Sequence, residues 1–161
     1  MKKKLIIISV IILSVTLLIA ARAMYIHFRF KPFIDITGEE GLRYEGKYEC
    51  GVVLPAQFPK IQGNLYVTPI RHAQKNENGK LEIKKEPLCD LIIHVRFPSG
   101  YNIRAQVNDE NGNGLDDIFL NENMELESDD GKEIYEKYYK EIRESFVVAH
   151  TVFGILNPPE E

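Results

Sequence analysis

Oxygen-bearing groups alternate within one short polar stretch near the middle of the chain. The side chains of Asp109, Asn111, Asn113 and Asp117 offer carboxylate or amide oxygens, and Leu115 offers its backbone carbonyl. Ca²⁺ takes six to eight hard oxygen ligands, and alternate positions around a tight loop can direct them inwards. The stretch therefore predicts a calcium-binding loop.

The order of these positions resembles the D-x-D-x-D-G-x-x-D calcium loops of thrombospondin type 3 and dockerin-like repeats. Asp109, Asn111 and Asn113 match the first three side-chain ligand positions, Gly114 the turn glycine and Asp117 the ninth position. The resemblance covers only this loop, and it implies an affinity near ~10⁻⁴–10⁻³ M, as in extracellular modules. The alternative is an Asn- and Gly-rich connection between strands, which uses the same residues for positive φ angles.

The two cysteines, Cys50 and Cys89, both fall at positions predicted to face the interior of a sheet. Two cysteines in an exported domain can form a disulfide. The interpretation that we favour is a pair of buried thiols that act as small hydrophobic side chains. Burial also argues against a nucleophilic cysteine, which needs a neighbouring base and access to solvent.

Histidines are the remaining candidates for acid–base chemistry. His94 is predicted to face outwards beside Arg96 and opposite Arg104, which suits a solvated polar face or an anion-binding patch. The sequence contains no histidine pair with metal-binding spacing, no Gly-rich phosphate loop, and neither G-x-S-x-G nor H-E-x-x-H. These features favour a protein that is not an enzyme. The alternative is a small cell-envelope enzyme in which folding joins His72, His94 and the loop Asp109–Asp117.

Charge is divided unevenly along the chain. Residues 32–161 hold all 24 acidic residues and 14 of the 20 basic residues, a net charge of −10. A surface of that sign repels the phosphates of nucleic acids and of anionic lipids. We therefore expect no nucleic-acid partner, and attachment to lipid through the N-terminal segment rather than through the rest of the chain.

An uncharged apolar run, from Leu5 to Ala21, follows three lysines. As a helix this run spans about 25 Å, and an extension to Ile26 reaches the ~30 Å of the hydrocarbon core because Arg22 can extend to the headgroups. We interpret residues 5–26 as a membrane-spanning helix. The aromatic and basic residues that follow suit the membrane interface, and Pro32 is expected to end the helix.

The three lysines place the N-terminus on the cytoplasmic side and the bulk of the chain outside. This describes a single-pass protein of the cell membrane with a signal-anchor. The alternatives are a secretory signal cleaved near Ala23, which would release the rest of the chain, and a buried helix of a soluble protein.

Alternating apolar side chains predict an antiparallel sheet of five to six strands. The central hairpin is expected to place Phe97 opposite Tyr101 and Val95 opposite Ile103. Pro69 predicts that its strand lies at an edge or contains a bulge, because proline cannot donate to a ladder. The predicted strands cover residues 43–54, 63–72, 80–86 after an Asn78-Gly79 turn, 91–97, 101–107 and part of 118–127.

A C-terminal helix is predicted to begin at a capping box made by Asp130 and Glu133 and to end at Gly154. Its second half is apolar nearly all round, which indicates burial in the core or contact with a protein partner. The apolar stripe of this helix comprises Ile134, Tyr138, Ile142, Phe146, Ala149 and Phe153.

The sequence thus predicts an α+β protein with two parts: a membrane anchor or signal segment over residues 1–31, and one extracytoplasmic domain over residues 32–161, in which the C-terminal helix packs on the sheet. The expected function is that of a membrane-tethered binding or protein-interaction module of unknown ligand. The alternatives are the envelope enzyme and a secreted domain with a structural calcium loop.

Overall fold

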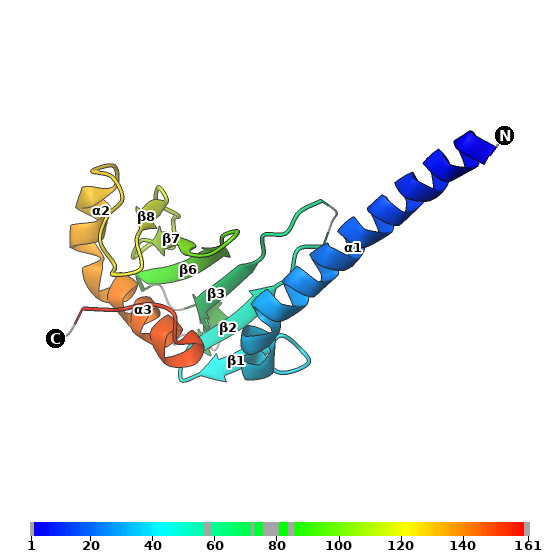
Figure 1. Cartoon of the computed structure of the whole chain (residues 1–161). Helices are drawn as coiled ribbons and strands as arrows, with labels where there is room; N and C mark the ends of the chain where they lie inside the picture. Colours follow the sequence, from blue (N-terminus) through cyan, green and yellow to red (C-terminus); the bar gives the residue numbers. More distant parts are fainter. Residues whose placement is uncertain (1, 57–58, 72, 76–80, 84–85, 160–161) are drawn as a thin grey trace.

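The structure is a computed structural model and describes residues 2–56, 59–71, 73–75, 81–83 and 86–159. Figure 1 shows a long helix that projects from a sheet covered by a second helical segment. The elements in chain order are α1 (Lys2–Thr37), β1 (Leu42–Glu45), β2 (Tyr48–Val53), β3 (Asn64–Pro69), β4 (Ala73–Lys75), β5 (Leu81–Ile83), β6 (Leu88–Val95), β7 (Tyr101–Asn108), β8 (Ile118–Leu120), α2 (Lys132–Lys137) and α3 (Tyr139–Phe153).

The main sheet has six antiparallel strands in the order β1-β2-β3-β6-β7-β8. Side chains alternate strictly between its two faces, as the sequence pattern predicts, so one face is apolar and the other polar. The described parts of β4 and β5 form a separate pair. The buried face carries Cys50, Leu65, Val67, Cys89, Leu91, Ile93, Val95, Ile103, Ala105, Val107, Ile118 and Leu120.

Two helices cover this buried face. The predicted stripe of the C-terminal helix is buried from Tyr138 to Phe153, and the last turns of α1 join the same core through Phe30 and Phe33. The rings of Phe33 and Phe153 meet edge to face with centroids 6.0 Å apart. The α+β fold predicted from the sequence is therefore confirmed, with α1 as a second covering helix that the sequence pattern does not predict.

The prediction that Pro32 ends the first helix is wrong. Helix α1 continues through Pro32 to Thr37, with Pro32 exposed and Phe33 buried. Proline removes one hydrogen bond from the helix, but the burial of Phe30 and Phe33 on the opposite side holds the following turn in place. The helix therefore runs unbroken across residues 31 and 32, and Phe30 belongs to the core.

The single strand predicted over residues 43–54 is a hairpin. The chain turns at Gly46, which has a φ of 58°, and β1 then pairs with β2. Tyr44 is consequently exposed, whereas Tyr48 and Cys50 keep their predicted inward positions. The alternation alone does not reveal this turn, because Gly46 has no side chain and so fits either face of a continuous strand.

Two other strand predictions need correction or lie outside the described residues. Strand β3 is interior, between β2 and β6, and not at an edge. It accommodates Pro69 as its last residue, where the ladder ends. The predicted turn at Asn78-Gly79 lies outside the described residues.

The central hairpin forms, but its register differs by two residues from the prediction. Val95 pairs with Tyr101 and Ile93 with Ile103, and the N–H of Arg96 donates to the carbonyl of Gly100 at 3.0 Å. The connection therefore spans residues 96–100, and Gly100 has a φ of 88°. A shift of two residues preserves the face of every side chain, which is why burial was predicted correctly.

The segment before the helices also differs from the prediction. The short strand falls on Ile118–Leu120, and Met124 lies in a turn with a φ of 66°. The helical segment starts after Gly131, whose φ is 85°, with no side-chain cap, so the capping box of Asp130 and Glu133 does not form. Glycine takes this left-handed conformation at little cost and so sets the start of the helix.

The N-terminal half of α1 projects beyond the sheet and is exposed on all sides (Figure 1). The described chain has one helix long and apolar enough to span a membrane or act as a signal anchor, from Ile6 to Thr37. Two of its hydroxyl side chains are satisfied within the helix, because Ser14 and Thr16 donate to the carbonyls of Val10 and Ile12, both at 2.9 Å. This segment therefore suits an apolar environment.

Candidate functional site

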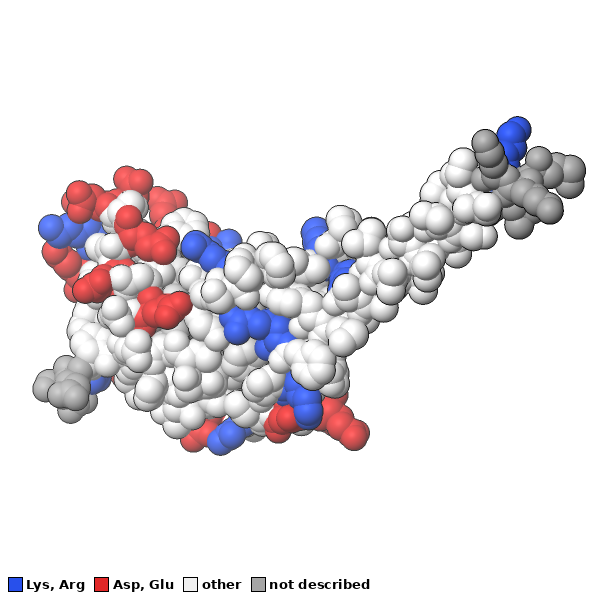
Figure 2. All heavy atoms as spheres, in the orientation of Figure 1, with Lys and Arg blue, Asp and Glu red and all other residues white. Residues whose placement is uncertain are grey.

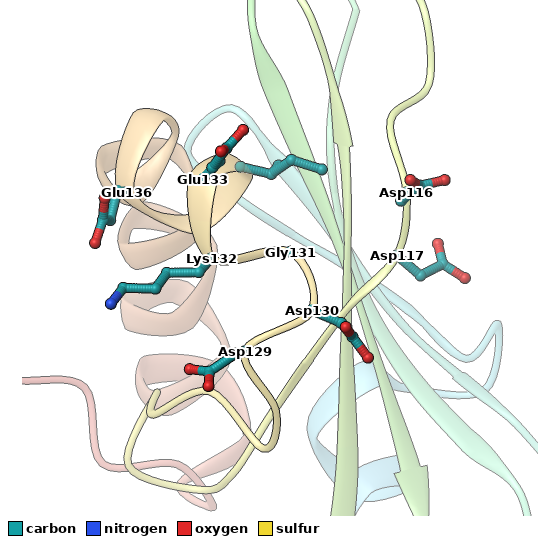
Figure 3. A pocket seen from close by; sticks show the side chains of 9 residues that line it. Asp116, Asp117, Asp129, Asp130, Gly131, Lys132, Glu133 and Glu136 are labelled. Carbon is teal, nitrogen blue, oxygen red and sulfur yellow. The ribbon is translucent and has the colours of Figure 1, made fainter.

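An acidic hollow of about 810 Å³ lies at the start of the C-terminal helical segment. Two short connections form its walls: the residues that lead into β8 and the turn that leads into α2 (Figure 3). Six carboxyl groups and one lysine surround it, so its formal charge is strongly negative. The lining residues are Asp116, Asp117, Asp129, Asp130, Gly131, Lys132, Glu133, Ile134 and Glu136.

Gly131 is the residue that shapes this hollow. Its left-handed conformation turns the chain into α2, and a Cβ at this position would lie 3.4 Å from the side chain of Ile118 at the start of β8. The turn therefore lies directly against β8. This contact brings Asp129 and Asp130 to the same side of the domain as Asp116 and Asp117.

Asp117 is the best-held carboxylate of the hollow. It accepts a hydrogen bond from Arg104 Nη1 at 3.0 Å and another from Gln106 Nε2 at 2.9 Å. Both partners lie on β7, on the polar face of the sheet. These contacts direct Asp117 towards the sheet and link the polar face to one wall of the hollow.

The acidic side chains surround the hollow without converging on one point. In Figure 3 Asp116 and Asp117 lie on one side, and Glu133 and Glu136 lie on the other. Among the described residues, no group of three or more His, Cys, Asp or Glu side chains could hold a metal ion. The arrangement therefore suits an extended cationic group better than a single coordinated ion.

The predicted calcium loop lies beside this hollow and shares Asp117 with it. Asp109 accepts hydrogen bonds from the N–H groups of Asn111 and Asn113, both at 2.8 Å, and from Asn113 Nδ2 at 3.1 Å. These bonds lower the pKa of the Asp109 carboxyl, with the Asn113 N–H as the largest cause. Asp109 thus organises the first half of the loop, while Asp117 bonds to β7, and the calcium site stays a prediction.

His94 lies at the other end of the central strands. Strand β6 pairs Leu88 with Asn108, directly before the loop, and pairs His94 with Asn102. Six residues of strand separate these two pairs by about 20 Å. The structure therefore does not bring His94 to the loop Asp109–Asp117, and His72 lies outside the described residues.

The surroundings of His94 are polar and positively charged. Its Nδ1 lies 2.8 Å from Asn64 Oδ1, in the neighbouring strand β3. Burial lowers the pKa of His94, and Arg104 and Arg96 lower it further. The predicted pairing of His94 with Arg104 is replaced by a diagonal one, because Arg104 pairs with Ile92.

Both cysteines are free and buried, as we favoured from the sequence. Cys50 pairs with Val67 on β3, and Val67 pairs with Leu91 on β6, so one whole strand separates the two cysteines. Two strand spacings amount to about 9.5 Å, which exceeds the ~7 Å limit for a disulfide. Burial raises the pKa of Cys50 to about 11 and that of Cys89 to about 12, so neither thiol suits nucleophilic chemistry.

The acidic hollow was not identified from the sequence, although the sequence contains a signal for it. Residues 109–136 hold eleven of the 24 acidic residues and a single basic residue, Lys132. The spacing of oxygen-bearing residues indicates a metal loop, whereas the density of acidic residues indicates the hollow. The turn at Gly131, which joins the two acidic stretches in space, needed the structure.

Comparisons with known proteins give no family: no protein-family model, no curated protein and no solved structure matches this chain. The class of protein that the residues define is an α+β domain with a projecting apolar helix at one end and an acidic hollow at the other.

Proposed function

We propose that the protein is a membrane-tethered binding module that presents its acidic hollow outside the cytoplasm to a cationic partner. The observation that carries this proposal is the separation of the two features. In Figure 2 the apolar helix projects from one end, and most of the acidic side chains visible on this face gather at the end farthest from its tip. A smaller acidic group lies beside the other end of α1.

The apolar helix supports the tether. Its exposed part, from Ile6 to Ala21, has no charged side chain, and three lysines precede it. A helix segment of this length with exposed apolar side chains is stable in a hydrocarbon core, and lysines ahead of it favour a cytoplasmic N-terminus. With this orientation the acidic hollow faces away from the membrane on the outer side.

The spread of charge supports a partner with several basic groups, such as a basic segment of another protein. Six carboxyl groups around about 810 Å³ provide a field that attracts lysine and arginine side chains at long range. Calcium at the neighbouring loop is compatible with this role. The C-terminal helix has most of its apolar surface in the core, through Phe146, Ala149, Val152 and Phe153, and a partner at its exposed side remains a prediction.

The test uses the full chain in detergent micelles and a fluorescent octalysine peptide as the probe. We expect salt-sensitive binding that weakens at least about tenfold, about 1.4 kcal/mol, in the double variant Asp129→Lys, Asp130→Lys. The matched control is Glu39→Lys, Glu40→Lys, which reverses two exposed acidic residues beside the C-terminal end of α1. Equal weakening in both variants would show that the peptide follows net charge and not this hollow.

A further inference from the structure

The end of the sheet nearest the projecting helix has a surface of its own, which we call the proximal rim. It consists of the connection between β2 and β3, described at residues 54–56 and 59–63, and the connection 96–100 between β6 and β7. Both connections lie at the same end of the sheet, because Asn64 pairs with His94 and Val95 with Tyr101. Helix α1 leaves the domain at this end.

Two contacts fix the rim against the helix where the apolar run ends. Arg22 donates to the carbonyl of Lys60 at 3.0 Å and to the carbonyl of Pro55 at 3.1 Å. The rings of Tyr25 and Phe97 meet edge to face with centroids 5.1 Å apart. Both connections of the rim therefore reach the level of residues 22–25 of α1.

That level corresponds to the lipid headgroups when residues up to Ala21 occupy the hydrocarbon core. The headgroup layer is roughly 5–8 Å thick on each side, which a helix crosses in about three to five residues. Residues 22–26 of α1, the last residues of the predicted span, therefore lie at the boundary between the hydrocarbon core and this layer. The helix cannot enter the bilayer to Ala21 without bringing the rim to the headgroups.

The rim exposes apolar side chains of the kind found at membrane interfaces. Phe97 is 56% exposed and Leu54 is 43% exposed, and Val53, the last residue of β2 and the neighbour of the rim, is also exposed. On the adjoining helix, Met24 and Phe28 are exposed too. Aromatic and aliphatic side chains at this depth are stabilised by burial among the headgroups and upper acyl chains.

The rim is basic, although the domain as a whole is acidic. Residues 50–66 and 91–107 contain no Asp or Glu, and the first acidic residue of α1 is Asp35. Lys60 and Arg96 lie on the two connections, and Glu122 is an acidic side chain that lies beside Gly100. Electrostatic interaction with anionic lipid falls off within a Debye length, about 8 Å at physiological salt. The basic residues of the rim therefore determine its interaction with the membrane, and the distant acidic residues contribute little.

A hollow of about 410 Å³ opens at the rim, on the polar side of the sheet. Its lining includes Lys60, Gln62, Asn64 and His94, so it offers one cation and several hydrogen-bonding groups. Arg104 and Arg96 add positive potential, as their effect on the pKa of His94 indicates. This chemistry suits a phosphate group.

We propose that the proximal rim rests on the bilayer, with Phe97 among the lipids and the phosphate of an anionic phospholipid in the hollow beside Lys60 and His94. The proposal rests on the membrane anchor of the proposed function and revises the expectation that the domain avoids anionic lipid. It implies that the domain sits upright on the membrane in one orientation, with the acidic hollow directed away from the surface.

The test uses the full chain in vesicles of phosphatidylcholine, alone or in an equimolar mixture with phosphatidylglycerol, with brominated acyl chains as quenchers. The chain contains no tryptophan, so each substitution gives a single reporter. Phe97→Trp reports the rim, and Leu13→Trp reports the anchor. The control is Tyr139→Trp, which replaces an exposed aromatic residue at the start of α3.

We expect quenching in the Leu13→Trp and Phe97→Trp variants and several-fold less in Tyr139→Trp. If Leu13→Trp is quenched but Phe97→Trp is quenched no more than Tyr139→Trp, the contact between the rim and the bilayer is overturned and the anchor is retained. Absence of quenching in Leu13→Trp would overturn the anchor and the rim with it.

A second comparison tests the phosphate. We expect Lys60→Glu with Arg96→Glu to reduce the quenching of Phe97→Trp in the anionic vesicles, while Lys132→Glu, which lies in the acidic hollow, leaves it unchanged. If the rim substitutions do not change the quenching of Phe97→Trp in anionic vesicles, the proposal that the hollow binds a lipid phosphate is wrong.

Discussion

His94 is held in its neutral form by its surroundings. Burial, Arg104 and Arg96 lower its pKa below the ordinary value of 6.5, and Asn64 Oδ1 on the neighbouring strand accepts a hydrogen bond from its Nδ1. The unfolded chain, in which His94 has its ordinary pKa, therefore binds a proton more readily than the folded chain. Stability must then fall as the pH drops below about 6.5.

We predict that the melting temperature of the full chain in micelles falls between about pH 7 and pH 5.5, and that His94→Gln removes part of this fall. Glutamine keeps a hydrogen bond to Asn64 without the titration. His27→Gln, at an exposed position on α1, is the control and should leave the fall unchanged. An identical pH dependence in His94→Gln and the native chain would contradict this account.

Asp109 allows the calcium prediction to be tested at a single residue. Its carboxylate already accepts three hydrogen bonds from the loop, so the loop is organised without a cation. If the predicted site forms, millimolar Ca²⁺ should raise the melting temperature by about a few degrees relative to chelator, and Asp109→Asn should abolish the rise. Asn keeps an acceptor for the loop while it removes the charge.

A matched control for calcium is Asp35→Asn, at an exposed carboxylate of α1 far along the chain from the loop. No rise in melting temperature up to several millimolar Ca²⁺ would make the loop an ordinary Asn- and Gly-rich connection.

At the scale of elements, the sequence predicted faces better than connections. Strict alternation identified nearly every buried strand residue, because a side chain must point to one face or the other. It could not reveal that β3 is central, or that Pro69 ends a strand instead of marking an edge, because strand order depends on contacts between distant segments. Contacts between distant segments also override the local signal at Pro32, since burial of Phe30 and Phe33 outweighs the hydrogen bond that the helix loses there.

The junction between α1 and the sheet depends on Gly63. A Cβ at this position would lie 2.6 Å from the carbonyl oxygen of Val53 and 2.7 Å from the ring of Phe30. We predict that Gly63→Ala destabilises the domain by about 1–3 kcal/mol, because either the strand or the helix must move. Chemical denaturation in micelles, followed by near-UV circular dichroism, measures the change.

The control for this junction is Gly114→Ala, where the nearest atom to a Cβ is Asn108 Oδ1 at 3.9 Å. A Gly63→Ala variant as stable as Gly114→Ala would mean that α1 does not pack against the sheet at Phe30.

At the scale of the whole molecule, the two ends have opposite characters. From Ile6 to Ala21 the projecting part of α1 is uncharged and apolar, and the rim connections carry Lys60 and Arg96. The far end is acidic (Figure 2). The sign and amount of charge follow from composition, but this arrangement does not, because folding brings residues 116–117 and 129–136 together around one hollow. The arrangement matches a tethered module that binds at the end away from the membrane.

The measurement that tests this account most directly is the labelling of single introduced cysteines with a membrane-impermeant maleimide in intact cells. Cys50 and Cys89 are buried with raised thiol pKa values, so the native chain should label little. We predict that Ser128→Cys, at an exposed position near the acidic hollow, is labelled in intact cells, and that the labelled chain stays in the membrane fraction after a carbonate wash. Lys4→Cys should be labelled only after lysis. Labelling of Ser128→Cys only after lysis, or its recovery in the soluble fraction as a chain that begins near Met24, would contradict the tethered, outward-facing module.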